Sequence, residues 1–299
     1  MRLASWCTEQ LGSAPVDVLF EHRSISQVFG LRLADGREVV VKLRDDDGRA
    51  ESCVAAQARL AERGFPCPRP ITPVVRVGEV AVHAEESLPG GELLRGDTPD
   101  VAVRYAAVFA RLMAELATVT VRPPLPNPRW VRWDHDDSGL WPAIGFLDER
   151  DQSAVPAFLT ETAQRARKRL LAAELPCVLG HADLEAQNLR WRDGEVWAVH
   201  DWDSLAWQPE AALVGAAAAT FANVPPPHLP PVESSQAFLQ AYQELRGREF
   251  TVREQEAAWA AGLWTATHNA RWEALHGDAP VSGDGVRAQA AERLRRANA

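Results

Sequence analysis

The chain has 299 residues, 46% of them hydrophobic and 24% charged, which is enough for one large or two medium domains around a sizeable core. Asp and Glu outnumber Lys and Arg by 41 to 32, giving a formal net charge of −9, and such a surface disfavours nucleic acid or a membrane as the main partner. No run approaches the roughly 18 apolar residues of a membrane span. The start of the chain lacks the apolar stretch of a signal peptide. The four cysteines are scattered and lack the spacing of a disulfide or zinc framework, so we interpret them as reduced thiols and expect a cytoplasmic protein.

The first part of the chain has the pattern of a β-hairpin. Residues 27–33 and 38–43 are apolar and rich in β-branched side chains, and the Asp35-Gly36 dipeptide between them is a strong turn signal. A two-residue turn at this dipeptide places Lys42 opposite Phe29.

Further elements follow in chain order. A helix is predicted over about 49–63, and two short strands are predicted over 71–83. Beyond Gly91 the apolar spacing becomes helical. A capping box at 251–254 opens a long helix that Gly277 closes.

The order of these elements predicts an α+β fold with two parts. Strands dominate residues 1–87, which we expect to form a small antiparallel sheet lobe. Helical spacing dominates residues 88–299, which we expect to form a larger, mainly helical lobe.

The polar residues of greatest interest lie between 181 and 203. The Asp193-Gly194 dipeptide predicts a second two-residue hairpin, which sets Asn188 opposite Val199 and places Asp201 two residues further along the same face. Asp183 lies five residues before Asn188, in the loop that leads to this end of the hairpin. Two carboxylates and an amide therefore converge, and such an oxygen-rich site suits Mg²⁺ together with phosphate oxygens.

This region resembles a known family. The pattern His181-x-Asp183-x-x-x-x-Asn188 followed by Asp201-Trp202-Asp203 is similar to the catalytic segment of aminoglycoside phosphotransferases, which share the protein-kinase-like fold with choline kinases. The resemblance extends to Val40-Val41-Lys42, to 64–68 and to Leu88-Pro89-Gly90, in the family's order. It implies a bilobal protein-kinase-like fold with a nucleotide-binding first lobe and a catalytic, substrate-binding second lobe.

The resemblance also implies an activity, the transfer of the γ-phosphate of ATP to a hydroxyl group with the help of Mg²⁺. Asp183 would orient the acceptor hydroxyl and accept its proton. Asn188 and Asp201 would hold Mg²⁺, and Lys42 would contact the α- and β-phosphates. His181 is expected to be a buried organiser of the loop.

Other nucleotide-site residues follow from the family pattern less directly. The family places a helical glutamate beside the strand lysine, and Glu51 is the acid nearest to that position, so it is the expected partner of Lys42. Ser24 and Ser26 stand where a glycine-rich phosphate loop is usual and can cap phosphate oxygens, although an ordinary serine turn is an equal alternative. The main chain around Glu86 would form the hinge that pairs with adenine.

The acceptor site is expected on the helical lobe. Trp264, His268 and Trp272 are spaced at i, i+4 and i+8 and form one helical stripe. Together with the carboxylate of Asp203, such an aromatic wall suits a cationic acceptor such as an aminoglycoside, an amino sugar or an amino alcohol. The alternative is that the stripe packs in the core of the lobe.

Two further functions stay open. A nucleotide-binding pseudokinase is suggested by the irregular phosphate loop and by Ala212, which replaces an acid that the family uses near the catalytic loop. A metal-dependent hydrolase built on His181, Asp183, His200 and Asp201 leaves Lys42 unexplained. The expected partner is a small molecule with a hydroxyl group, and the sequence does not set the oligomeric state.

Overall fold

The computed structural model describes residues 3–23, 26–122 and 125–299. Within these residues the chain divides into two compact units. The first unit extends to Gly91 and adds Val119–Pro126 and Arg192–Asp203, and the second takes the remainder. The sequence had placed both added segments in the helical lobe, so the sheet unit gains Asp201 and Asp203 from late in the chain.

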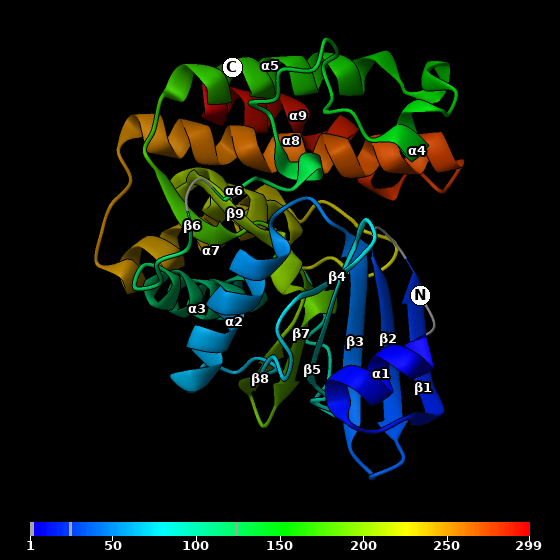
Figure 1. Ribbon diagram of the computed structural model, residues 1–299. Coiled ribbons are helices and arrows are strands. Elements are labelled where there is room, and N and C mark those ends of the chain that lie inside the picture. Colours follow the sequence, from blue (N-terminus) through cyan, green and yellow to red (C-terminus); the bar gives the residue numbers. More distant parts are fainter. Residues whose placement is uncertain (1–2, 24–25, 123–124) are drawn as a thin grey trace. The chain divides into compact units, whose positions relative to one another are not determined.

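The first unit is built on an antiparallel sheet with the strand order β1-β2-β3-β5-β4. Helix α1 lies across strands β1 to β3 (Figure 1). The elements up to Gly91 are α1 (Leu3–Leu11), β1 (Pro15–Arg23), β2 (Gln27–Leu33), β3 (Glu38–Asp45), α2 (Ala50–Glu62), β4 (Val75–Val77) and β5 (Val80–Glu86).

The hairpin of β2 and β3 has a three-residue loop rather than the predicted two-residue turn. Residues 34–36 stand outside the ladder, and Gly36 has a φ of +86°. A type I turn followed by a left-handed residue is a common three-residue connection. The extra loop residue shifts the register by one, so Lys42 lies opposite Val28 instead of Phe29.

The two faces of this sheet differ in polarity because strand side chains alternate. On one face, apolar side chains of β2, β3 and β5 form a buried cluster with Trp6, Cys7 and Leu11 of α1. On the other face, Lys42 lies directly opposite His83 in the β3–β5 ladder, and both are buried. The first face is therefore the core of the unit, and the second presents buried charges.

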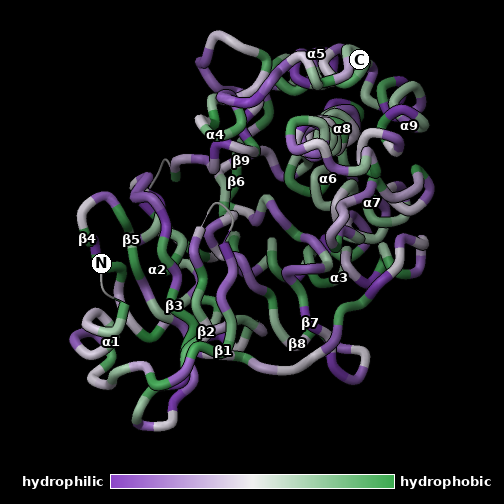
Figure 2. The backbone as a smooth tube through the Cα atoms, turned by 90° about the vertical axis from the view of Figure 1, so that its right-hand side faces the viewer, coloured by the Kyte–Doolittle hydropathy of each residue, from purple (hydrophilic) through white to green (hydrophobic). Residues whose placement is uncertain are grey.

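Helix α8 is the central element of the second unit. It lies between α5 and α6 in both views, and α9 packs against it (Figures 1 and 2). The helices are α3 (Pro99–Leu116), α4 (Gly145–Asp148), α5 (Ala157–Ala173), α6 (Glu210–Thr220), α7 (Val232–Arg246), α8 (Val252–His276) and α9 (Val281–Ala297). The predicted capping box is present at Thr251 and Glu254, and Gly277 ends α8 in a left-handed conformation.

Two short sheets complete the fold. Strands β6 (Cys177–His181) and β9 (Leu205–Pro209) pair antiparallel, and β7 (Leu189–Arg192) pairs with β8 (Glu195–Val199). Asp193 and Gly194 both have positive φ, which confirms the predicted two-residue turn. Short 3₁₀ turns occur at Arg129–Val131, Gln152–Ala154, Ala186–Asn188 and Trp202–Ser204. Along the described residues, none of the helices has both the length and the apolarity that crossing a bilayer requires.

Candidate active site

Lys42 is held by a carboxylate on the neighbouring strand. Its Nζ lies 3.0 Å from Oε1 of Glu85, and the two side chains are 8% and 2% exposed. Lys42 and Glu85 belong to β3 and β5, two residues apart diagonally on the same face of the sheet. Gln57 of α2 donates to Oε2 of Glu85 at 2.8 Å and to the carbonyl of Pro68. The ion pair is thus fixed by two strands and one helix.

The predicted pairing of Lys42 with Glu51 is wrong. Glu51 is an exposed residue of α2 whose Oε1 lies 2.7 Å from Nη1 of Arg76. The face of α2 that approaches the polar side of the sheet carries Gln57, one turn beyond Cys53, and Glu51 lies about 200° around the helix from Cys53. Glu85 was missed because its segment was interpreted as a hinge acting through its main chain.

The segment after β8 folds back to the same polar face. Nη1 of Arg44 lies 3.0 Å from Oδ2 of Asp203, and both side chains are buried. Arg49 donates to the backbone carbonyl of Asp203. Trp202 is buried, with its indole N–H donating to the carbonyl of Val199 at 2.9 Å. These contacts account for Asp203 as an internal ion-pair partner, and they give no support to its predicted contact with the acceptor.

Asp201 lies within this same charged group. It has a φ of +62°, a left-handed conformation that costs a non-glycine residue energy and is often found at functional sites. Burial acts to lower the pKa of Lys42, but the carboxylates of Glu85, Asp203 and Asp201 outweigh it, and the pKa is raised. Lys42 therefore remains a cation in a buried position, as binding to phosphate oxygens requires.

His83 is the neutral member of the group. Its burial, with Lys42 and Arg44 near by, lowers its pKa to about 4, although Glu85 acts in the opposite direction. At pH 7 the ring therefore adds no positive charge. Lys42 and Arg44 are the cations that β3 supplies to this face.

The second unit holds the other predicted catalytic residues. His181 is buried at the end of β6, and its Nδ1 accepts the backbone N–H of Asp183 at 3.2 Å. The side-chain amide of Asn188 donates to the carbonyl and to Oδ2 of Asp183, both at 3.1 Å. Asn188 lies in the Ala186–Asn188 turn rather than in β7, and Val199 bonds to Pro66, so the predicted ladder pairing of Asn188 with Val199 is wrong.

A buried carboxylate that the sequence analysis overlooked supports the Asp183 loop. Oε1 of Glu185 accepts the side-chain amide of Asn223 at 2.7 Å, and the backbone N–H of Gln187 donates to the carbonyl of Asn223 at 3.0 Å. Glu185 is 7% and Asn223 1% exposed. The loop therefore has a polar anchor of its own, although Ala212 lacks the acid of the family pattern. No local signal marks Asn223, because the contact joins residues 38 apart.

The side-chain oxygens of Asn188 and Asp201 are of the type that Mg²⁺ binds. Asn188 uses its amide nitrogen in both bonds to Asp183, which leaves Oδ1 as the atom suited to a cation. Mg²⁺ takes one or two carboxylates and completes its shell with water and other oxygens, so Asp201 and Asn188 are each of a ligand type that it accepts. Among the described residues there is no group of three or more His, Cys, Asp or Glu side chains arranged to hold a metal ion.

The remaining nucleotide-site predictions lie near the ends of strands. Ser26 is a half-buried bend residue just before β2, and Ser24 lies outside the described residues. Glu86 is the last residue of β5, and its side chain is ion-paired with Arg69. A main-chain role for this segment is unaffected by that pair.

The aromatic stripe of α8 is only partly exposed. Trp264 is 1% exposed and lies 5.1 Å, centroid to centroid, from the ring of Trp141. His268 is half-buried beside the same ring, and Trp272 stacks on His276 with centroids 4.4 Å apart. The structure thus places Trp264 in the core and keeps part of Trp272 accessible.

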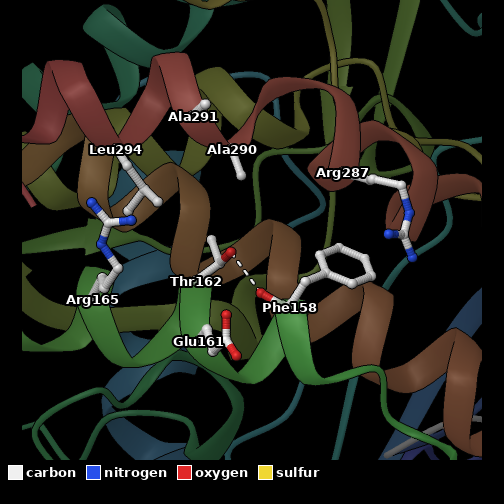
Figure 3. Close-up of a pocket in the computed structure, with 8 residues that line it drawn as sticks. All are labelled: Phe158, Glu161, Thr162, Arg165, Arg287, Ala290, Ala291 and Leu294. Atoms are coloured by element: carbon white, nitrogen blue, oxygen red, sulfur yellow. Dashed lines mark hydrogen bonds between the residues drawn. The ribbon is translucent and has the colours of Figure 1, made fainter.

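A groove between α5 and α9 contains none of the predicted residues (Figure 3). Its floor includes Phe158 and Leu294, and Arg287 stacks on the Phe158 ring at 4.0 Å. The groove thus pairs apolar side chains with a few charges, and nothing in it resembles a phosphoryl-transfer site.

Comparison with known proteins identifies a family and a fold. A family model described as the phosphotransferase enzyme family matches residues 19–212. An amicoumacin kinase in complex with AMP-PNP and Ca²⁺ has a TM-score of 0.63 at 14% identity, covering 95% of this chain and 90% of its own. A spectinomycin phosphotransferase in complex with ADP and spectinomycin has a TM-score of 0.58 at 12% identity, covering 99% of this chain and 93% of its own. A microcompartment-associated aminopropanol kinase has a TM-score of 0.60 at 16% identity, covering 94% of this chain and 89% of its own.

No curated protein matches the chain in sequence. The similar structures, all below 20% identity, share the protein-kinase-like fold, which confirms the predicted α+β class with an antiparallel sheet first and helices after it. The family match covers Lys42, Asp183, Asn188 and Asp201. The chain belongs to the phosphotransferase enzyme family, whose members include kinases of small molecules.

Proposed function

We propose that this chain transfers the γ-phosphate of ATP to a hydroxyl group of a small molecule, with Mg²⁺ on the nucleotide. The observation that carries the proposal is the buried Lys42 cation, which lies near enough to the half-buried Asp201 for that carboxylate to help raise its pKa, although the two residues are far apart in sequence. Similar structures that hold AMP-PNP with Ca²⁺ or ADP support a nucleotide with a divalent cation.

Each residue has a role that phosphoryl transfer needs. Lys42, oriented by Glu85, contacts the α- and β-phosphates. Asn188 and Asp201 hold Mg²⁺, which neutralises charge on the phosphate oxygens. Asp183 orients the acceptor hydroxyl and accepts its proton, and its bonds with Asn188 and His181 fix the loop that carries it.

The acceptor is proposed only as a small molecule with a hydroxyl group. The cationic acceptor predicted from the sequence needed a carboxylate beside the α8 stripe. Asp203 forms an ion pair with Arg44, so it does not serve that purpose. Cationic acceptors therefore enter the test as one class among several.

A broad acceptor screen tests the proposal. Purified protein with ATP and Mg²⁺ should release ADP with at least one member of a panel of aminoglycosides, amino alcohols, neutral sugars and hydroxy acids. MgATP alone should raise the melting temperature by mass action. Stabilisation by MgATP without turnover on the whole panel would favour the pseudokinase alternative, and the absence of stabilisation would contradict nucleotide binding.

A further inference from the structure

Trp141, in a loop distant in sequence, packs over one face of α8. Trp264, His268 and Arg271 are spaced at i, i+4 and i+7, so they share this face. The Trp141 ring lies 5.1 Å from the Trp264 ring and 6.4 Å from the His268 ring, and the Arg271 guanidinium lies 5.4 Å from the Trp141 ring centroid. Trp141 belongs to the irregular stretch before α4 and is half-buried.

Buried polar atoms on this face lack partners. Within residues 3–23, 26–122 and 125–299, no hydrogen-bond partner exists for Nε1 of Trp264, Nδ1 of His268, or Nε and Nη1 of Arg271. Trp264 is 1% and Arg271 2% exposed. A buried donor without an acceptor is costly, and more so when it is charged, so several of them on one helix face indicate a ligand that supplies acceptors.

The carboxylates near this face are already engaged. Glu273 accepts the backbone N–H groups of Ser282 and Gly283 at 2.8 and 3.1 Å, and thereby caps α9. Nη2 of Arg271 donates to Oδ1 of Asp148 at 3.1 Å and to Oε1 of Gln152 at 3.0 Å, and the Asp148 side chain is 42% exposed. This face therefore offers donors without partners beside a guanidinium that already has one carboxylate, which suits the acceptor oxygens of an anion better than a cation.

His268 adds a donor without adding charge. Burial and the neighbouring Arg271 lower its pKa to about 4, so the ring is neutral at pH 7. Arg271 is then the charge that selects the ligand, and the two rings supply the hydrogen bonds and the walls.

We propose that this face of α8 binds the carboxylate of a small organic acid, with Arg271 as the ion-pair partner and with Trp264 and His268 as hydrogen donors, and that Trp141 is displaced when the acid binds. The charge-assisted bond from a guanidinium to a carboxylate is the strong member of such a set. A site of this kind goes beyond the proposed kinase activity, because it can hold the acceptor itself or an acid that is not consumed.

Three probes of similar size and different charge test the site. We expect calorimetric titration of the full chain to show binding of gluconate, and at least tenfold weaker binding of neutral sorbitol and cationic glucosamine. Hydroxy acids of two to six carbons extend the series to shorter ligands. Equal affinity for the three probes, preference for glucosamine, or no binding of any acid would overturn the proposal.

Variants of two buried arginines separate recognition from stability. Arg271→Gln should weaken gluconate binding by about tenfold or more, since bonds to charged groups are the stronger ones. Arg293→Gln is the matched control, because Arg293 is 1% exposed, close to the 2% of Arg271, and lies 5.5 Å from a tryptophan ring, but its bonds go to Ser235, to the carbonyl of Pro230 and to the side-chain oxygen of Gln289. Trp264→Phe removes only the indole donor and should weaken binding severalfold, which keeps the test valid if Arg271→Gln fails to fold. Unchanged affinity in both site variants would contradict the assignment.

Turnover measurements show whether the bound acid is the acceptor of the phosphate or an acid that is not consumed. If the bound acid is the acceptor, ADP release and a phosphorylated acid should appear with MgATP. If it is not consumed, binding should persist while no ADP release and no phosphorylated acid appear with the acid and MgATP. Because binding is measured without nucleotide, a failure of the kinase proposal and a failure of this site give different results.

Discussion

The roles that we propose for Asp183 and Lys42 can be separated by single substitutions. Asp183 belongs to a loop held by its own hydrogen bonds with His181 and Asn188, whereas Lys42 is held by an ion pair inside the sheet. A substitution of Asp183 should affect the transfer of the proton, and a substitution of Lys42 should affect the binding of the nucleotide phosphates.

We predict that Asp183→Asn lowers turnover by roughly 10²- to 10⁴-fold, the range that a general base contributes, because an amide cannot accept the hydroxyl proton. MgATP should still raise the melting temperature of the variant. The measurement is steady-state ADP release beside a thermal shift titration. Asp193→Asn, at the turn between β7 and β8, is the control, since asparagine tolerates the left-handed conformation found there. Full turnover in the Asp183 variant would remove this residue from the catalytic role.

We predict that Glu85→Gln raises the KM for ATP by tenfold or more, because Lys42 loses the carboxylate that orients it. The KM for the acceptor should stay nearly constant. Glu51→Gln should change neither constant by more than about twofold, since the exposed pair of Glu51 with Arg76 contributes at most about 1 kcal/mol. If the Glu51 variant has the larger effect on ATP, the lysine has a different partner in the working enzyme than in this structure.

At the scale of elements, α6 and α8 make an unusually close contact through glycine. A Cβ atom on Gly215 would lie 1.9 Å from the carbonyl oxygen of Ala258, and one on Gly262 would lie 2.9 Å from the carbonyl oxygen of Gly215. The two helix backbones therefore approach within a distance that no side chain permits.

Gly215→Ala should lower the free energy of unfolding by at least about 1–3 kcal/mol, because α6 and α8 have to separate to admit the methyl group. Chemical denaturation measures the change. Gly145→Ala is the matched control, since nothing lies within 4 Å of the position of its Cβ, and it should stay within about 0.5 kcal/mol of the wild type. Equal stability of the two variants would show that α6 and α8 can separate at little cost.

The elements were predictable where a local signal defines them. The capping box at Thr251 and the closing Gly277 gave the bounds of α8, and positive φ at Asp193 and Gly194 agrees with the predicted turn. The loop at 34–36 was mispredicted by one residue because the same dipeptide serves two- and three-residue turns.

Parts of the site depended on contacts that no local pattern contains. The Lys42–Glu85 pair needs the β3–β5 register, and the Glu185–Asn223 bond needs the packing of a distant segment. The motif did predict the buried position of His181 in the Asp183 loop, whereas the partners Glu85 and Asn223 could not be predicted. The ion pair of Asp203 with Arg44 also could not be predicted, because the position of Asp203 two residues after Asp201 gives no information about a partner on β3.

At the scale of the whole molecule, His268 should, like His83, make the free energy of unfolding depend on pH. Its pKa is about 4 in the folded chain, against about 6.5 in an unfolded one. Between these values the unfolded chain binds more protons, so the folded state loses stability as the pH falls from 6.5 towards 4.

We expect this histidine to account for up to about 3 kcal/mol of that loss, at 1.36 kcal/mol per pKa unit. His268→Asn should therefore flatten the dependence of the unfolding free energy on pH between 7 and 5, measured by denaturant titration at each pH. Parallel slopes for variant and wild type would show that the ring is already protonated in the folded chain or easily reached by water.

The pairing of Lys42 with a residue of β5 has a consequence for control of the enzyme. Protein kinases place the partner of the corresponding lysine on a helix whose position controls activity, so that swinging the helix breaks the pair. Here the two residues stand on adjacent hydrogen-bonded strands, and no displacement of α2 can part them while the sheet is intact. Movement of α2 is therefore not expected to switch this chain off by breaking the lysine pair, as movement of the corresponding helix does in protein kinases.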